Sequence, residues 1–265
     1  MKISIITPCY NSEKTIERTI KSVINQKLDL EFELEYIIID GLSTDKTLDI
    51  IKKFAKKHTN IKFISEKDNS MTEALNKGLK MATGDIIASI NADDMYLTGA
   101  LNKICTEFKK YHNKNIIIAN TYFVYEKDQK IKSKNKPRFF NPIISSIVEC
   151  PFPECSIFFR KECFDNVGYF NEKIKYTQDY ELYLRLYDYG YKFNYLNIDV
   201  SNFYISDTNY SSTISDKMEI EVLSYIKYKR LFKFCAESTI SKIFKVLLGM
   251  RVYNIKNIFY KEVLK

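Results

Sequence analysis

The sequence predicts an α/β fold with a mostly parallel central sheet flanked by helices. Short apolar runs, typical of buried strands, alternate along the first half of the chain with segments of helical periodicity. Strands that alternate with helices pair in parallel, because each helix carries the chain back across the sheet. The 265 residues, of which 45% are hydrophobic and 28% charged, suffice for one sizeable core and exclude a disordered chain.

The first half carries this alternation most clearly. Predicted strands and helices take turns over 3–7, 13–26, 35–40, 44–57, 61–65, 71–81 and 85–90. In each helix the apolar residues recur three or four positions apart and form one buried stripe. Ser43 or Thr44 is expected to cap the second helix. Ligands of such a sheet bind beyond the carboxyl ends of its strands, so the turns there are the candidate site.

After residue 100 the pattern is looser. Further helices are predicted over 97–111 and 177–189, and further strands over 115–125, 156–159 and 197–204. Residues 127–153 hold runs of lysine and four of the five prolines, and we expect a surface loop there.

The net charge of +8 is concentrated at the C-terminal end. Residues 217–265 carry 11 Lys or Arg and 4 Asp or Glu, whereas residues 1–216 carry 30 and 29. Apolar residues at helical spacing separate the basic ones, which predicts a basic amphipathic helical extension. Such helices can lie on an anionic membrane, pack on the domain, or join a second copy in a homodimer. A nearly neutral domain argues against nucleic acid as a partner.

The cysteines and the apolar segments indicate the compartment. Six cysteines are scattered without Cys-x-x-Cys spacing, and only two histidines could assist a zinc site, so we expect free thiols in a reducing cytosol. No apolar stretch is long enough to span a bilayer, and the run over 3–6 is too short for a signal peptide. The expected location is cytoplasmic, at the inner face of the membrane if the extension binds lipid.

Polar residues follow the first two strands at the edge where ligands bind. After the first strand, Tyr10 could stack on a base and Asn11 could form a hydrogen bond to it. Asp40 ends the second strand, where it could accept from an imide N–H or a ribose hydroxyl. The alternative is that Asp40 or Asp45 only caps the following helix, which fits Asp45 better.

The fourth strand delivers two adjacent carboxylates, Asp93 and Asp94, after Asn91 and Ala92. Neighbouring like charges are unfavourable unless a cation or protons intervene. Oxygen ligands at this place suit Mg²⁺ or Mn²⁺ bound to a diphosphate. A helix-capping role could account for one of the two aspartates but hardly for both.

Two predicted helices carry further candidates. Asn76 and Lys77 fall off the apolar stripe of the third helix, and Lys77 could bind a phosphate or form a structural ion pair. Asp179 lies in the first turn of the helix over 177–189, where the helix dipole favours its ionised form. An ionised carboxylate facing a cleft is a competent general base, although first-turn aspartates more often only complement the dipole.

These motifs occur together and in one order, and in this the chain resembles the family 2 glycosyltransferases over about residues 1–190. The segments similar to the opening and middle of the family are 5–11, 39–47, 65–69, 74–78 and 82–85. Asn91-Ala92-Asp93-Asp94 looks like its Asp-x-Asp motif, and the segment 178–185 looks like its acceptor-side motif. Together these motifs are highly specific.

The resemblance implies the A-type glycosyltransferase fold, a Rossmann-like arrangement, with a nucleotide-sugar donor and inversion at the anomeric carbon. The residues that it places on the nucleotide-sugar are Thr7, Pro8, Tyr10, Asn11, Asp40, Asn76, Lys77, Asn91 and Ala92. It implies that Asp93 holds the divalent metal with Asp94 beside it, that Asp179 is the base, and that Gln178 lies on the acceptor side. Two departures are Asn91, where relatives have the first Asp of the motif, and Gln178, where many have Glu or Asp.

The sequence therefore predicts a catalytic domain over 1–216 and a basic extension over 217–265. Within the domain we expect a nucleotide-binding half over about 1–95 and an acceptor half over about 96–216. The expected activity is transfer of a hexose-like sugar from a nucleotide-sugar, most simply a UDP-sugar, to a saccharide or lipid-linked acceptor. The expected setting is bacterial surface glycan synthesis, with Mn²⁺ or Mg²⁺ as the cofactor.

Two other functions remain open. Asn91 would also suit a catalytically impaired protein that binds a nucleotide-sugar without transferring it. A nucleotidyltransferase of similar fold would carry a Gly-rich basic phosphate loop after the first strand, where this chain has Pro8-Cys9-Tyr10-Asn11.

Overall fold

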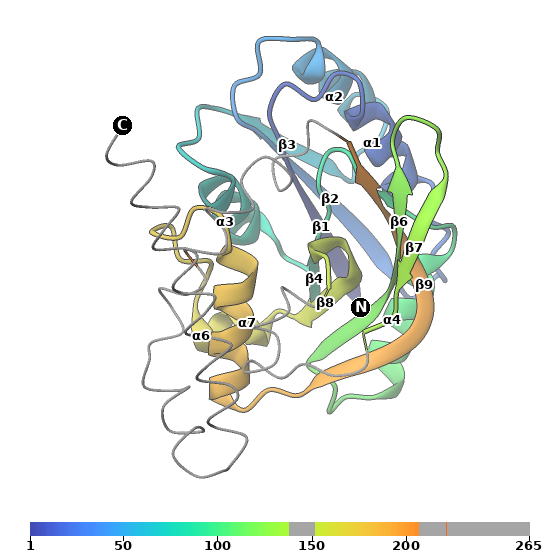
Figure 1. Cartoon of the computed structure of the whole chain (residues 1–265), viewed down its shortest axis with the longest axis vertical. Helices are drawn as coiled ribbons and strands as arrows, with labels where there is room; N and C mark the ends of the chain where they lie inside the picture. The colour runs from blue at the N-terminus through green and yellow to red at the C-terminus, as the bar shows by residue number, and fades with distance from the viewer. Residues whose placement is uncertain (138–151, 207–220, 222–265) are drawn as a thin grey trace, which may run out of the picture.

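The computed structural model describes residues 1–137, 152–206 and Glu221, and these form one nine-stranded sheet with helices on both faces (Figure 1). The strands lie in the order β3-β2-β1-β4-β8-β6-β9-β5, and β7 pairs with β6 beside this path. Their bounds are β1 Lys2–Cys9, β2 Glu33–Asp40, β3 Ile61–Ser65, β4 Ile86–Ser89, β5 Met95–Tyr96, β6 Ile116–Tyr125, β7 Ile131–Asn135, β8 Ile157–Arg160 and β9 Phe193–Ile205.

The predicted parallel sheet is confirmed for the first half of the chain. Strand β1 pairs in parallel with both β2 and β4, and β2 pairs in parallel with β3. The four carboxyl ends therefore point to one edge of the sheet, which carries the candidate residues. Beyond β4 the sheet is mixed, because β8 runs antiparallel to both β4 and β6.

The helices bury two separate cores, one on each face of the sheet. Their bounds are α1 Ile16–Ile24, α2 Thr47–Ala55, α3 Met71–Met81, α4 Ala100–Lys110, α6 Glu162–Val167 and α7 Gln178–Tyr189. Helices α1, α2 and α4 cover one face, and α3, α6 and α7 cover the other (Figure 1). Alternate residues of β1 divide between the two cores, with Ile5 in the first and Ile6 in the second.

The close approach of α3 to the sheet depends on a glycine. A Cβ at Gly78 would lie 2.4 Å from Cγ2 of Ile6, which is buried in β1. A glycine inside a helix costs about 1 kcal/mol relative to alanine. Close packing between α3 and β1 offsets that cost.

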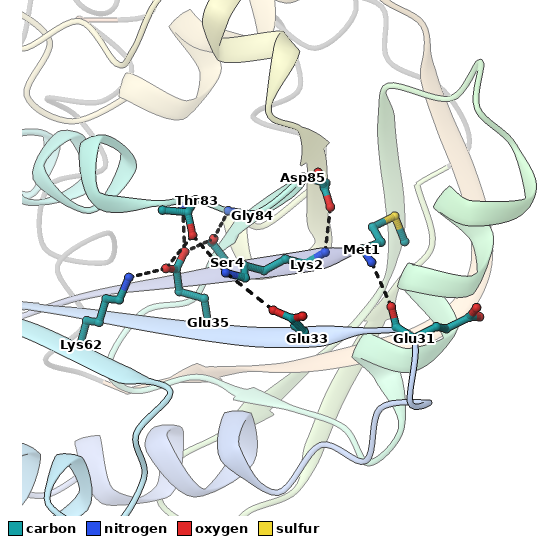
Figure 2. A network of polar contacts seen from close by, with 10 residues as sticks. All are labelled: Met1, Lys2, Ser4, Glu31, Glu33, Glu35, Lys62, Thr83, Gly84 and Asp85. Carbon is teal, nitrogen blue, oxygen red and sulfur yellow. Dashed lines mark hydrogen bonds and ion pairs between the residues drawn. The ribbon is translucent and has the colours of Figure 1, made fainter.

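A buried carboxylate joins neighbouring strands at the edge of the sheet opposite the candidate residues (Figure 2). Glu35 in β2 accepts hydrogen bonds from the Ser4 hydroxyl at 2.5 Å, the Lys62 ammonium at 2.7 Å and the Thr83 N–H at 2.8 Å. Burial alone would raise the pKa of Glu35, but these bonds outweigh it and lower the pKa to about 2. The Gly84 N–H donates to the Ser4 hydroxyl, so one network joins β1, β2, β3 and the turn before β4.

The structure corrects several predicted boundaries. Helix α2 begins at Thr47, and neither Ser43 nor Thr44 caps it. The Ser43 hydroxyl is occupied by the Asp40 carboxylate, and Asp45 accepts the Thr47 N–H at 2.9 Å, as expected for Asp45. Strand β9 begins earlier than predicted, at Phe193. The predicted loop over 127–153 contains β7, and two observed elements, β5 and α6, were not predicted.

The predicted basic extension over 217–265 lies outside the described residues, apart from Glu221. Within the described part of the chain, no helix has both the length and the hydropathy needed to cross a membrane.

Candidate active site

The loop after β4 carries the two predicted metal-binding aspartates, and α1 holds its backbone. The Arg18 guanidinium donates to the Asp93 carbonyl at 2.6 Å, and the Thr19 hydroxyl donates to the Asp94 carbonyl at 2.8 Å. Arg18 also pairs with Glu126 at 2.9 Å and lies 3.8 Å above the ring of Tyr204. The backbone of the loop is thus held by hydrogen bonds from α1. The Arg18 guanidinium that makes one of these bonds is itself held by Glu126 and by the ring of Tyr204.

The two aspartates face different surroundings. Asp93 is partly exposed, and burial raises its pKa above the ordinary range. Asp94 is 1% exposed; its Oδ1 accepts the Tyr204 N–H at 2.9 Å, and its Oδ2 has no hydrogen-bond partner among the described residues. Burial and the charge of Asp93 raise the pKa of Asp94 well above its usual value. This geometry favours Asp93 as a ligand for a cation outside the loop.

The donor set fits a divalent metal that is shared with a substrate. No cluster of three His, Cys, Asp or Glu side chains suited to a metal occurs among the described residues. Mg²⁺ in proteins is commonly held by one or two carboxylates together with substrate phosphates, and does not need an all-protein cage. A partly exposed Asp93 meets that requirement, and the next residue, Asp94, carries a buried Oδ2 without a hydrogen-bond partner among the described residues.

The predicted nucleoside-binding residues gather where β1 and β2 end, but they differ in accessibility. Tyr10 is 61% exposed, whereas Thr7 is buried and its hydroxyl contacts the Tyr36 hydroxyl at 3.1 Å. Pro8 is also buried. Asn11 has the left-handed φ of 47° and accepts the Thr44 N–H at 2.9 Å, which links the loops after β1 and β2. Of these residues, Tyr10 and Asn11 are exposed, and the ring of Tyr10 offers an aromatic surface to a base.

Asp40 is fully buried at the end of β2. Its carboxylate accepts hydrogen bonds from the hydroxyls of Ser43 and Ser65, the second at 2.6 Å. The two serines come from the loop after β2 and from the end of β3, so Asp40 joins these two elements. Its predicted contact with a nucleoside stays a prediction.

Asn76 and Lys77 of α3 are both engaged with other parts of the protein. Asn76 donates to the Phe170 carbonyl at 2.9 Å and accepts the Phe170 N–H at 3.0 Å. Lys77 pairs with Asp68 at 2.5 Å, with Glu66 at 2.9 Å and with Glu73 at 3.3 Å. Of the two interpretations of Lys77, the structure therefore shows the structural ion pair. The predicted contacts of both residues with a nucleotide-sugar stay predictions.

The acceptor-side motif opens α7 as expected. Gln178 is 3% exposed, and its Oε1 has no hydrogen-bond partner among the described residues. Asp179 is partly exposed, and its carboxylate accepts the N–H of Tyr180 at 2.7 Å. Tyr180 and Leu182 are buried in the core under α7, which fixes the helix behind Asp179.

A carboxylate that the sequence analysis missed lies between these two regions. Glu154, in the 3₁₀ helix η1 over Glu154–Ser156, accepts a hydrogen bond from Ser89 at the end of β4. Burial and the negative charge of Asp179 raise the pKa of Glu154 to about 7, although the Ser89 bond acts against this. The charge of Glu154 in turn adds to the raised pKa of Asp94. The signal in the sequence was a carboxylate between the predicted loop over 127–153 and the buried strand predicted over 156–159.

The four cysteines in the described part of the chain are not suited to act as nucleophiles. Cys9, Cys105, Cys155 and Cys163 are free and buried. Burial raises the pKa of Cys105 and of Cys163 to about 12, and it raises those of Cys9 and Cys155 as well. A thiol in this state is inert, because the thiolate is the nucleophile. The candidate site therefore consists of carboxylates from three elements: the loop after β4, η1 and α7.

Curated relatives resemble about two thirds to three quarters of the chain. It is 28% identical over 196 residues to a chondroitin synthase of Escherichia coli, covering 74% of this chain and 28% of that protein. It is 29% identical over 184 residues to the minor teichoic acid biosynthesis protein GgaB of Bacillus subtilis (strain 168), covering 68% of this chain and 20% of that protein. The chain thus spans less than a third of the length of either relative.

Solved structures show the same fold. S. aureus TarS in complex with UDP-GlcNAc superposes with a TM-score of 0.68 at 22% identity, covering 85% of this chain and 65% of that one. The mannosyltransferase PcManGT of Pyrobaculum calidifontis, in complex with GDP-Man and Mn²⁺, gives 0.64 at 15% identity, covering 84% and 63%. The predicted A-type glycosyltransferase fold is confirmed. The family model "Glycosyl transferase family 2" matches residues 4–168, more than half of the chain, and the chain therefore belongs to this glycosyltransferase family.

Proposed function

We propose that the chain transfers a sugar, with inversion, from a nucleotide-sugar to a hydroxyl of a saccharide or lipid-linked acceptor in bacterial surface glycan synthesis. The observation that carries the proposal is the placement of three carboxylates. Asp93 follows β4, Asp179 begins α7, and Glu154 lies within electrostatic range of Asp179. The proteins named above that make teichoic acid or chondroitin support the same class of product.

The proposed reaction is one in-line displacement. The acceptor oxygen forms a bond to the anomeric carbon while the bond from that carbon to the donor phosphate breaks. Asp179 takes the proton of the acceptor hydroxyl, and the nucleoside diphosphate leaves with the electron pair. No enzyme nucleophile is needed, which agrees with a site of carboxylates and inert thiols.

A divalent cation, Mn²⁺ or Mg²⁺, would neutralise the charge that develops on the leaving diphosphate. Asp93 is the residue proposed to hold it, with Asp94 beside it. The mannosyltransferase structure with GDP-Man and Mn²⁺ supports this choice of cofactor. The proposed donor is a UDP-sugar, supported by the TarS structures with UDP-GlcNAc and with UDP.

The test is turnover of UDP-GlcNAc with Mn²⁺, measured as released UDP, by the wild type and by Asp179→Asn. We expect kcat to fall at least about 100-fold in the variant, because the general base is lost, with donor affinity nearly unchanged. Asp165→Asn, in the first turn of α6, is the matched control and keeps full turnover. Full activity of Asp179→Asn would exclude Asp179 as the base.

The same assay addresses the second candidate, a protein that binds a nucleotide-sugar without transferring it. Asn91 in place of the first motif carboxylate is the observation that favours it. Tight binding of UDP-GlcNAc in calorimetry without any UDP release or transfer by the wild type would support this candidate over the transferase.

The basic extension over 217–265 is proposed to contact the inner face of the cell membrane, with a homodimer as the alternative. Its excess of lysine and arginine supports the first. Flotation with anionic liposomes would compare the wild type with a full-length variant carrying Lys227→Gln, Lys229→Gln and Lys233→Gln. We expect weaker flotation of the variant, and equal flotation would reject the membrane contact. Sedimentation in the absence of lipid distinguishes the homodimer.

A further inference from the structure

Three consecutive residues just before α7 donate hydrogen bonds to the carboxylate of Glu221, which is far from them in the sequence. The N–H of Lys175 donates to Oε1 of Glu221 at 2.8 Å. The N–H groups of Tyr176 and Thr177 donate to its Oε2 at 2.8 and 2.9 Å, and the Thr177 hydroxyl donates to the same oxygen at 3.0 Å. Glu221 is 44 residues beyond Thr177 in the sequence.

Of these donors, buried Thr177 most needs such a partner, because it stands at the N-cap position, just before the intrahelical hydrogen bonds of α7 begin. The helix dipole also favours a negative charge at this end of the helix. Thr177, at the N-cap position of α7, makes no capping bond to its own helix and is only 3% exposed. A buried donor without a partner costs about 1–3 kcal/mol. Glu221 supplies the acceptor, and its bonds are strengthened by its charge.

The segment held in this way is the one that presents the proposed base. Its other end is fixed by α3, because the Thr72 hydroxyl donates to the Ile174 carbonyl at 3.1 Å. Asp179 comes two residues after Thr177 and directly before Tyr180, which is buried in the core. Asp179 therefore sits between the bonds of Glu221 on one side and the packed body of α7 on the other.

We infer that Glu221 is a positioning residue for Asp179, so that this one residue of the predicted extension belongs to the catalytic unit. This inference rests on the proposed function, in which Asp179 is the base. It also means that a chain ending at residue 216, the predicted domain boundary, would lack the acceptor for the three N–H groups. A displacement of about 1 Å at a reacting group can cost about 100-fold in rate.

Kinetics of full-length variants test the inference with UDP-GlcNAc and Mn²⁺ as the probe and released UDP as the signal. We expect Glu221→Ala to lower kcat about 10- to 100-fold with little change in the donor KM, because the donor contacts are elsewhere. Glu221→Asp keeps a carboxylate and restores part of the loss. Glu33→Ala removes an exposed glutamate at the opposite end of the sheet and is the control. Wild-type kcat in Glu221→Ala would overturn the inference.

Chemical rescue separates positioning from a general loss of stability. Formate can occupy the site of the missing carboxylate, so sodium formate should raise kcat of Glu221→Ala towards the wild-type value and leave the control unchanged. Equal sodium chloride corrects for ionic strength. No rescue in a folded Glu221→Ala protein, together with an equal loss in kcat for Glu221→Asp, would assign Glu221 a purely structural role and overturn the inference.

Hydrogen exchange gives a readout that needs no activity. The amides of Lys175, Tyr176 and Thr177 should exchange faster in Glu221→Ala than in the wild type, while those of β1 stay protected. Unchanged exchange at these amides would contradict the inference. If the wild type releases no UDP and transfers no sugar, the proposed function fails by itself, and the exchange result still decides whether Glu221 holds this segment.

Discussion

The Ser89 hydroxyl donates a hydrogen bond to the Glu154 carboxylate, which joins the end of β4 to the short helix before β8. The bond brings a carboxyl group within electrostatic range of Asp179. Burial first, and then the charge of Asp179, raise the pKa of Glu154 to about 7. A carboxyl group with such a pKa gains a charge within the physiological pH range, which makes the protein sensitive to pH at this point.

Glu154→Gln should therefore change how stability depends on pH. The folded state keeps the Glu154 proton up to about pH 7 and the unfolded state loses it near 4.5, so wild-type stability falls as pH rises between these values. The variant lacks this contribution and should be more stable than the wild type above pH 7, by up to roughly 3 kcal/mol. Thermal unfolding in EDTA from pH 4.5 to 8 measures the difference. Parallel curves for the two proteins would contradict it, and Glu33→Gln serves as the exposed control.

Asp93→Ala should weaken donor binding that depends on metal. Asp93 is partly exposed, whereas the Asp94 carboxylate is turned to the Tyr204 N–H. Isothermal titration with UDP-GlcNAc, with and without Mn²⁺, should show a metal-dependent gain in affinity in the wild type that is absent in Asp93→Ala. Asp94→Asn keeps an oxygen for the Tyr204 N–H and should retain that gain. Equal loss in both variants would make Asp94 a ligand as well.

Glu35→Gln should destabilise the protein at neutral pH and much less in acid. The folded pKa of Glu35 is about 2, below the ordinary 4.5, so its contribution is complete above pH 4.5 and is lost as pH falls towards 2. The expected loss at pH 7 is at most roughly 3 kcal/mol. Urea unfolding of both proteins at pH 7 and at pH 3 measures it. The same difference at both pH values would show that the charge of Glu35 is not the cause.

Gly78→Ala should lower stability by about 1–3 kcal/mol despite the higher helix propensity of alanine. The new Cβ would lie 2.4 Å from Cγ2 of Ile6, which is too close without a shift of α3 or of β1. In an Ile6→Ala background the added methyl has room, so the same substitution should cost less there. A double-mutant cycle by urea unfolding gives the coupling between the two positions. Additive effects would show that the contact is not the source of the loss.

The regular part of the fold could be predicted because its signal is local. The strands β1, β2 and β4 are short, mostly apolar segments, as is typical of parallel strands that are buried on both faces. Strand β7 has no such signal: Ile131 is 62% exposed, and the strand exists through its pairing with β6. The predicted cap at Ser43 failed for a related reason, because Asp40 bonds to its hydroxyl.

Some residues of the candidate site are likewise marked by a local sequence pattern, and others depend on contacts between distant parts of the chain. Asp93 and Asp179 could be found from the sequence, since each stands at the end of a strand or at the start of a helix. The sequence pattern did not distinguish a phosphate contact of Lys77 from a structural ion pair. That distinction depends on Glu66, Asp68 and Glu73, which the fold brings around its ammonium group. Glu154 and Glu221 act through partners that are distant in the sequence, and no local pattern reports such a contact.

The Glu35 network and the candidate site lie at opposite ends of the same strands. Glu35 and Asp40 both belong to β2 and are separated by roughly 17 Å of extended chain. Changes in stability at one end of the strands can therefore occur independently of changes in activity at the other end. Substitutions around Glu35 change what fraction of the molecules is folded, and those around Asp93 change what each folded molecule does. A substitution near Asp93 can therefore leave the hydrogen bonds around Glu35 intact, and the reverse also holds.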